Sequence, residues 1–404
     1  MPTRPSAGAI LTLALLASAP SYAQQPMKPT ELKVEAQETG GRSGDGLVAK
    51  LRRFADDSQI VRRLNGDIDG WYPRLGGMTT GSGFAFGPGY RTHVWEDRVL
   101  VDLSAAMTMR GYKAVDTKAE WLQSRHPRLE LWTNFRYQDF PQEDFFGLGF
   151  SSDIAARTNY ALVSKDISAV TLFHATPWLR LGADTGYLIP AIGSGTDRNF
   201  PSTELVFSDA QAPGLRSQPH FLHTGLMAEV DYRDQPSNAR QGGYYRAAYS
   251  KWDDRTLQQF DFGRFDAQAA QYIPLGSKKH VLASRVGLST VNNKADDRVP
   301  FYFRPYVGGS DTIRSFKEFR FIDENSLYIN AEYRWAARKY LEVALFWDGG
   351  KVTRDWHDVN LRELKTAYGI GFRGATTKRV FVRLDIAAGG GEGHQIFFKV
   401  GPSF

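Results

Sequence analysis

The chain has 404 residues, of which 13% are aromatic, 39 are glycine and none is cysteine. The absence of cysteine excludes disulfides, thiolate catalysis and cysteine-based metal sites. The formal net charge of +6 is small and dispersed along the chain, so we expect no nucleic-acid partner.

The N-terminus has the features of a secretory signal. Arg4 supplies a positive start, residues 10–17 are apolar, and Ser21-Tyr22-Ala23 fits a cleavage site. A buried N-terminal helix is the alternative. We expect a signal peptide at 1–23, a short periplasmic N-terminal extension at 24–70 and a β-barrel at 71–404. No later run approaches the roughly 20 apolar residues of a membrane-spanning helix.

Alternation of apolar and polar residues predicts sixteen β-strands, and bacterial single-chain barrels require an even number. The predicted strands are 79–87, 90–96, 99–110, 113–124, 128–140, 157–167, 172–188, 221–233, 243–253, 260–273, 279–291, 327–335, 341–349, 366–375, 380–387 and 395–404. The predicted fold class is therefore all-β, a transmembrane antiparallel barrel.

The strand at 341–349 illustrates the alternation. Leu345 and Trp347 lie on one face, and Glu342 and Asp348 lie on the other. A half-exposed sheet of a soluble protein would alternate in the same way. Charges that recur on one face and aromatics near strand ends favour a membrane barrel with a wet lumen.

The predicted connections alternate between long and short. Residues 189–220 and 292–326 form long connections, whereas 274–278 and 336–340 form short ones. Outer-membrane barrels have long extracellular loops and short periplasmic turns. The pattern therefore predicts that both termini face the periplasm.

The long connection before the last five strands contains Ile313-Arg314-Ser315-Phe316 after a pair of glycines. A guanidinium inside a barrel needs carboxylate partners, because a desolvated unpaired charge is costly. Strand alternation directs Glu332 and Asp348 inward, so we predict that Arg314 pairs with both. The alternative is a solvated arginine and two unrelated carboxylates.

Two further motifs lie outside this connection. Asp231, Arg233 and Asp234 end a strand before a turn rich in proline and glycine, where carboxylates can cap turn amides. An ordinary polar turn is the alternative. Phe398, Val400 and Phe404 lie in the final alternating strand, which could also be merely a last strand.

These segments together resemble the BamA/TamA family of outer-membrane barrels. The family motif in the long connection is V/I-R-G-F, and Ser315 replaces its usual glycine. The resemblance implies that residues 313–316 fold into the lumen as a lumen loop motif, with Glu332 and Asp348 as partners. It also implies that the barrel assembly machinery recognises the C-terminal strand that ends at Phe404. The extension at 24–70 is too short for the family's periplasmic POTRA domain.

The resemblance implies insertion of proteins into, or translocation across, the bacterial outer membrane. The partners that it implies are outer-membrane lipids and client outer-membrane proteins or a separate periplasmic module. In that family the first and last strands can part at a lateral seam. Gly81, Gly83, Gly87 and Gly89 would weaken the first strand here, and Pro402 removes a donor from the last.

The alternative function is a passive channel or a surface-structural barrel without insertase activity. Signals for an enzyme are poor. Gly193-Ser194-Gly195 does not fit the nucleophile elbow of hydrolases, and no H-E-x-x-H motif occurs. We therefore expect no catalytic residue, no metal and no cofactor.

Overall fold

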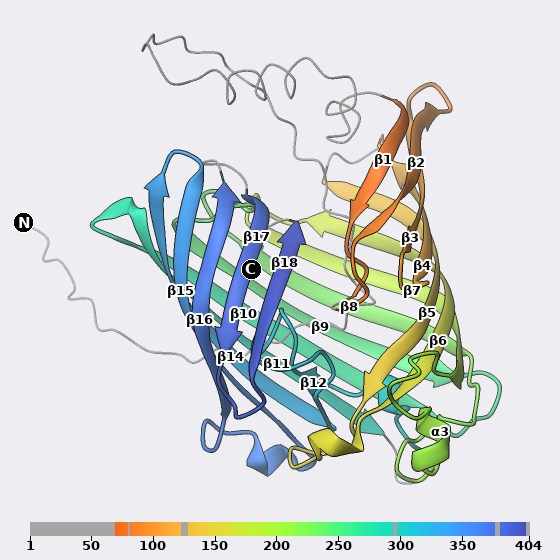
Figure 1. Cartoon of the computed structure of the whole chain (residues 1–404). Coiled ribbons are helices and arrows are strands. Elements are labelled where there is room, and N and C mark those ends of the chain that lie inside the picture. The colour runs from red at the N-terminus through yellow and green to blue at the C-terminus, as the bar shows by residue number, and fades with distance from the viewer. Residues whose placement is uncertain (1–68, 80, 123–127, 294–296, 376–379, 401–404) are drawn as a thin grey trace, which may run out of the picture.

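The computed structural model describes residues 69–79, 81–122, 128–293, 297–375 and 380–400. The predicted signal peptide and nearly all of the extension at 24–70 lie outside these ranges. Sixteen antiparallel strands follow one another in chain order in a single sheet that curves into a barrel (Figure 1). A two-stranded hairpin, β12 with β13, interrupts the series between β11 and β14.

The strands are β1 (Gly70–Gly76), β2 (Ala85–Val94), β3 (Val99–Thr108), β4 (Lys113–Trp121), β5 (Leu129–Phe145), β6 (Thr158–His174), β7 (Leu179–Ser194), β8 (Phe221–Asp231), β9 (Gly242–Asp254), β10 (Phe262–Leu275), β11 (Ser277–Asn293), β12 (Tyr306–Val307), β13 (Phe321–Ile322), β14 (Asn325–Arg338), β15 (Leu341–Thr353), β16 (Lys365–Ala375), β17 (Val380–Ala388) and β18 (His394–Val400). The described helices are short and lie in the connections: η2 (Ile154–Ala156), α3 (Thr203–Val206), η3 (Phe301–Phe303) and η4 (Trp356–Asp358). Within the described part of the chain, no helix is both long enough and apolar enough to cross a membrane.

The two ends of the barrel differ in their connections. Only Gly276 separates β10 from β11, whereas 195–220 and 294–324 form long excursions at the other end. We call these the short-turn end and the long-loop end. Strand β1 begins and β18 stops at the short-turn end, as the predicted alternation of connections requires.

In the described part of the chain the sheet has two edges that no hydrogen-bonded ladder joins. Strands β1 and β18 are its two edges, and they come round to the same side of the barrel in Figure 1. No ladder joins these edges among the described residues. We call this junction the seam.

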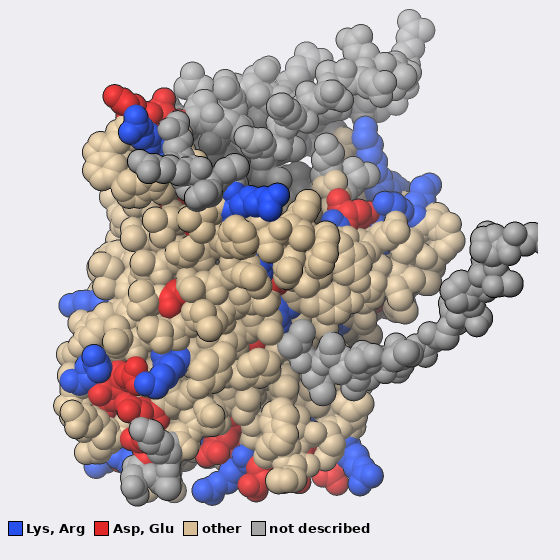
Figure 2. Space-filling model, turned by 180° about the vertical axis from the view of Figure 1, so that it is seen from behind, with Lys and Arg blue, Asp and Glu red and all other residues tan. Residues whose placement is uncertain are grey.

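The strands are apolar outside and polar inside. On β15 the side chain of Leu345 is 55% exposed, whereas Glu342 and Asp348 are buried on the opposite face. On the outer wall seen from behind, most charged residues lie near the two ends (Figure 2). This distribution suits an apolar membrane around the middle of the barrel.

The hydrophobic core lies in the lumen rather than between two layers. The described part of the connection between β11 and β14, residues 297–324, folds back into the barrel, and we call it the lumen loop. Its Phe301, Phe303, Phe316 and Phe321 are each 1% exposed and pack against inward residues of the wall. The barrel and the loop therefore share one core.

The prediction of sixteen strands is confirmed, but the first two predicted strands are wrong. The structure places β1 at Gly70–Gly76, before the predicted strand 79–87, and merges the end of that strand with 90–96 in β2. Gly81 and Gly83 have φ values of 90° and 86° in the turn between β1 and β2. They therefore belong to a turn and do not weaken a strand.

Strand β2 was hard to predict because Gly87-Pro88-Gly89 resembles a turn. In the structure these residues pair with β1. A Cβ on Gly89 would collide with the ring of Tyr72. Glycine is thus needed in β2 for a neighbouring aromatic ring, a requirement that only the register reveals.

Candidate functional site

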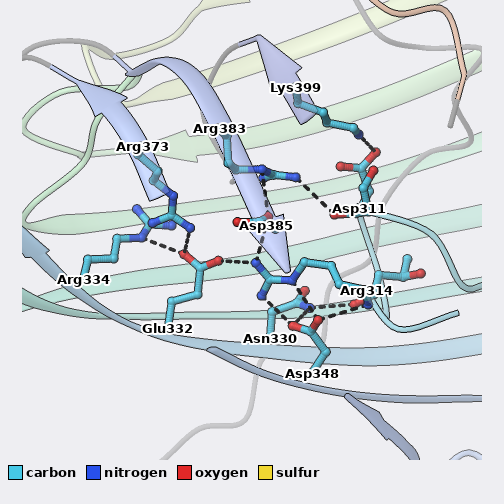
Figure 3. A network of polar contacts seen from close by, with 12 residues as sticks. Asp311, Arg314, Asn330, Glu332, Arg334, Asp348, Arg373, Arg383, Asp385 and Lys399 are labelled. Atoms are coloured by element: carbon cyan, nitrogen blue, oxygen red, sulfur yellow. Dashed lines mark hydrogen bonds and ion pairs between the residues drawn. The ribbon is translucent and has the colours of Figure 1, made fainter. Parts of the chain in front are cut away.

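Arg314 lies at the centre of a buried network between the lumen loop and the wall (Figure 3). Its Nη2 and Nε donate to the two carboxylate oxygens of Asp348, at 2.7 and 2.8 Å. Its Nη1 donates to Glu332 Oε1 at 2.7 Å. The structure therefore brings Arg314 together with the two carboxylates that were predicted to pair with it.

Two further groups complete the surroundings of this guanidinium. Asp385 on β17 lies 3.4 Å from Nη1. The guanidinium carbon lies 3.5 Å from the ring centroid of Phe346, which is a cation–π contact. The arginine is thus held by three strands, β14, β15 and β17, through charge, hydrogen bonds and a ring face.

The carboxylates also have partners on the wall. Glu332 accepts from Arg334 and from Arg373, each at 2.8 Å. Asp348 accepts from Asn330 Nδ2 at 2.7 Å, and the same amide donates to the carbonyl of Thr312 in the lumen loop. Buried charges are stable only when they are fully paired, which this network achieves at its centre.

The neighbours of Arg314 in the motif are buried as well. Ile313 and Phe316 pack with Tyr328 and Val352 of the wall. The Oγ of Ser315 is buried and has no hydrogen-bond partner among the described residues. The smaller glycine of the family motif would leave no such hydroxyl at this position.

The lumen loop also holds the last hairpin, β17 to β18. Arg320 forms an ion pair with Glu392 in the connection between these strands, at 2.7 Å. Arg320 also donates to Ser152 in the connection between β5 and β6, at 2.9 Å. Asp311 pairs with Lys399 of β18 at 2.8 Å. The loop therefore ties the edge strand β18 to the interior.

The loop also approaches the other edge of the seam. Glu318 accepts a hydrogen bond of 3.4 Å from Thr79, in the turn that follows β1. The lumen loop thus contacts the last hairpin through Arg320 and Asp311, and the β1–β2 turn through Glu318. It is the part of the described structure that joins both sides of the seam from within.

The turn motif forms a local unit at the short-turn end. Arg233 donates to both oxygens of Asp231, at 2.9 and 2.8 Å. Asp234 accepts from the backbone N–H groups of Arg240 and Gln241 and pairs with Lys278 at 2.8 Å. Burial alone would raise the pKa of Asp234, but these donors outweigh burial and lower it.

The C-terminal strand is an edge with an apolar outer face. Phe398 and Ile396 are 64% and 62% exposed, and Val400 is the last residue of β18. Phe404 lies outside the described residues. A role of these side chains in recognition by the assembly machinery stays a prediction.

Sequence reasoning missed several members of the network, namely Asn330, Arg334, Arg373, Arg383 and Asp385. Alternation does place Arg383 and Asp385 on the inward face of β17. For Arg373 the missing information was the register, because it reaches Glu332 on β14 from β16, across β15. No sequence pattern predicted the contact of Arg320 with Glu392, since both residues lie in connections, which have no regular alternation.

The arrangement holds a loop in place. Its charged groups are paired with each other and are buried. Across the described residues, no group of three or more His, Cys, Asp or Glu is placed to hold a metal ion. The chemistry that the network supports is a strong but reversible attachment of the lumen loop to β14, β15 and β17.

Comparisons with known proteins agree with the barrel fold. Residues 217–404 match the Omp85 superfamily domain. The fold is similar to BamA from Haemophilus ducreyi lacking POTRA domains 1-3, with a TM-score of 0.63 and 14% identity over 83% of this chain and 70% of that chain. It is also similar to CdiB from Escherichia coli, with a TM-score of 0.50 and 9% identity over 81% of this chain and 61% of that chain. No curated protein matches the chain in sequence.

Proposed function

Since residues 217–404 carry an Omp85 superfamily domain and the barrel has the BamA fold in the bacterial outer membrane, we propose that this chain assists insertion or translocation of client proteins there. The observation that carries the proposal is the seam. Strands β1 and β18 are sheet edges with no mutual ladder among the described residues. An edge strand presents unpaired N–H and C=O groups that can template an incoming strand.

The shape of the edges supports the same proposal. Strand β1 has seven residues and the described part of β18 also has seven, whereas β5 and β6 have 17 each. Short edges form few hydrogen bonds with each other, so parting them costs little. A client strand that pairs with β18 would gain backbone hydrogen bonds there while its apolar side chains face the lipid beside Ile396 and Phe398.

A disulfide lock across the seam tests the proposal. Single cysteines scanned along β1 are combined with single cysteines along β18, and pairs that oxidise are kept. The native chain has no cysteine, so every crosslink is unambiguous, and a disulfide requires Cα atoms within about 7 Å. We expect the locked barrel to lose insertion of a radiolabelled outer-membrane protein into proteoliposomes, and reductant to restore it.

A lock elsewhere provides the matched control. Tyr90 on β2 and Leu103 on β3 are register partners that both face outward. Cysteines at these two positions should crosslink without affecting insertion. Full activity of the seam-locked barrel would refute the proposal. A stable single-channel conductance without insertion would instead favour the passive channel.

A further inference from the structure

The connection between β15 and β16, residues 354–364, lies on the outside of the barrel at the long-loop end. We call it the outer flap. Its Val359 packs against the cluster of Leu288 and Ala267. Lys351, on the outward face of β15, is only 7% exposed because its Nζ donates to the carbonyl of Arg362 in the flap. The flap therefore covers part of the wall that would otherwise face lipid.

A groove of about 660 Å³ lies between the outer flap and the wall formed by β9, β10 and β11. Aromatic side chains line it from both sides, with Trp356 on the flap and Tyr249 and Phe265 on the wall. Trp356 is 53% exposed and Tyr249 is 46% exposed. Ring faces are thus available to a ligand in the groove.

The absence of a side chain at Gly263 leaves room for two polar groups beside these rings. A Cβ on Gly263 of β10 would collide with Tyr249 Oη and with Asn292 Oδ1, which approach it from the neighbouring strands. Neither of these two groups has a hydrogen-bond partner among the described residues. They leave an acceptor and a donor free at the edge of the groove.

Charges of both signs complete the lining. Arg354 and Asp355 are exposed on the flap, and the side chain of neither forms a hydrogen bond with a described residue. Glu324 lies opposite and is 3.7 Å from Arg304. The residues that line the groove include two carboxylates, of Glu324 and Asp355, and one guanidinium, so the lining itself does not suit a phosphate group.

The polar groups and aromatic rings of the groove favour a saccharide over an acyl chain as its ligand. An acyl chain would cover Tyr249 Oη, Asn292 and Arg354 without satisfying them, which is costly. A saccharide has hydroxyl groups that both donate and accept, and its C–H faces can pack on Trp356 and Tyr249. The balance of aromatic and uncharged polar groups therefore fits a sugar.

The position of the groove indicates how the sugar reaches it. The groove opens on the outer wall, where Tyr249 continues the apolar surface that faces lipid, and Leu361 of the flap is 61% exposed. We propose that the groove binds the uncharged saccharide headgroup of a glycolipid in the membrane leaflet around the long-loop end. This site is separate from the seam and from the network of Arg314.

Native mass spectrometry of the full barrel tests this assignment. The protein is released from a sugar-free detergent after incubation with diglucosyl diacylglycerol, with phosphatidylglycerol or with free maltose. We expect retention of the glycolipid in preference to the other two probes. Trp356→Ala should reduce retention about tenfold, the upper range for loss of one aromatic contact, and Asn292→Ala should reduce it too.

The matched control is Trp178→Ala. Trp178 is 50% exposed but lies in the turn between β6 and β7, at the short-turn end. It should leave retention unchanged, and heat-modifiable gel mobility shows that each variant is folded. Equal retention of phosphatidylglycerol, equal affinity for free maltose, or an equal loss in Trp178→Ala would each overturn the proposal.

Discussion

Replacement of Arg314 by alanine removes a side chain that joins the lumen loop to β14, β15 and β17. Glu332 keeps Arg334 and Arg373 as partners after this change. Asp348 keeps only hydrogen bonds, from Asn330 Nδ2 and from the backbone N–H of residue 314. The loss of stability therefore arises mainly from Asp348, whose carboxylate is 0% exposed and loses its only cationic partner among the described residues.

The size of the effect follows from that burial. Removal of one partner from a buried ion pair costs about 3–5 kcal/mol. Loss of the cation–π contact with Phe346 adds about 0.5–2 kcal/mol. Because Glu332 remains paired, we expect the free energy of unfolding to fall by about 4 kcal/mol rather than by the sum for two broken pairs.

Urea unfolding in lipid vesicles, followed by tryptophan emission, measures this change. Trypsin cleavage after Lys317 reports separately whether the loop has left the lumen. Arg298→Ala is the matched control, because Arg298 also lies in the lumen loop and pairs with Asp209 at 2.9 Å, but is 41% exposed. An exposed pair contributes about 0–1 kcal/mol.

A second substitution identifies the source of the penalty. In Arg314→Ala with Asp348→Asn the uncompensated carboxylate is gone, so part of the lost stability should return, with a coupling of about 1–3 kcal/mol. If Arg314→Ala cost no more than Arg298→Ala, or if Asp348→Asn gave no rescue, Asp348 would not depend on Arg314.

Two further predictions concern the last hairpin and the turn motif. A Cβ on Gly390 would collide with the ring of Phe316, whereas one on Gly391 meets nothing, and both glycines have positive φ. Gly390→Ala should therefore expose the lumen loop to trypsin more than Gly391→Ala; equal exposure would argue against that ring contact. The lowered pKa of Asp234 stabilises the fold above the pKa of the unfolded chain, about 3.9, and this contribution is lost as pH falls through the folded pKa. Asp234→Asn should accordingly lose less stability than the parent in acid unfolding below about pH 4.

The inward positions of two site residues could be predicted from the alternation of apolar and polar residues along the strands. Glu332 and Asp348 lie on different strands, yet both were assigned to the lumen because alternate residues on each strand were apolar. Their pairing with Arg314 was predicted because a guanidinium in the lumen needs carboxylates and because the resemblance to the BamA/TamA family implies that this loop enters the lumen. Regular strands thus carry the information about which face a residue occupies.

The rest of the site could not be predicted, because it depends on contacts between residues that are far apart in the sequence. Whether Asp385 or another inward carboxylate reaches Arg314 depends on the register of β17 and on the path of the lumen loop. The contact between Arg320 and Glu392 joins two connections that have no period. The start of β2 was missed because Gly89 is required by the ring of Tyr72, and a glycine in the sequence does not reveal which neighbour needs the space.

The partners of Arg314 have a consequence for the order of folding. Glu332, Asp348 and Asp385 all follow it in the chain, the last by 71 residues. The segment around Arg314 emerges before the strands that pair with it, so its ion pairs cannot form until β14, β15 and β17 are in place. Loop docking is therefore a late event that reports completion of the C-terminal half of the barrel. Until then Arg314 and the aromatic residues around it remain in water, and chain-closure entropy delays their burial.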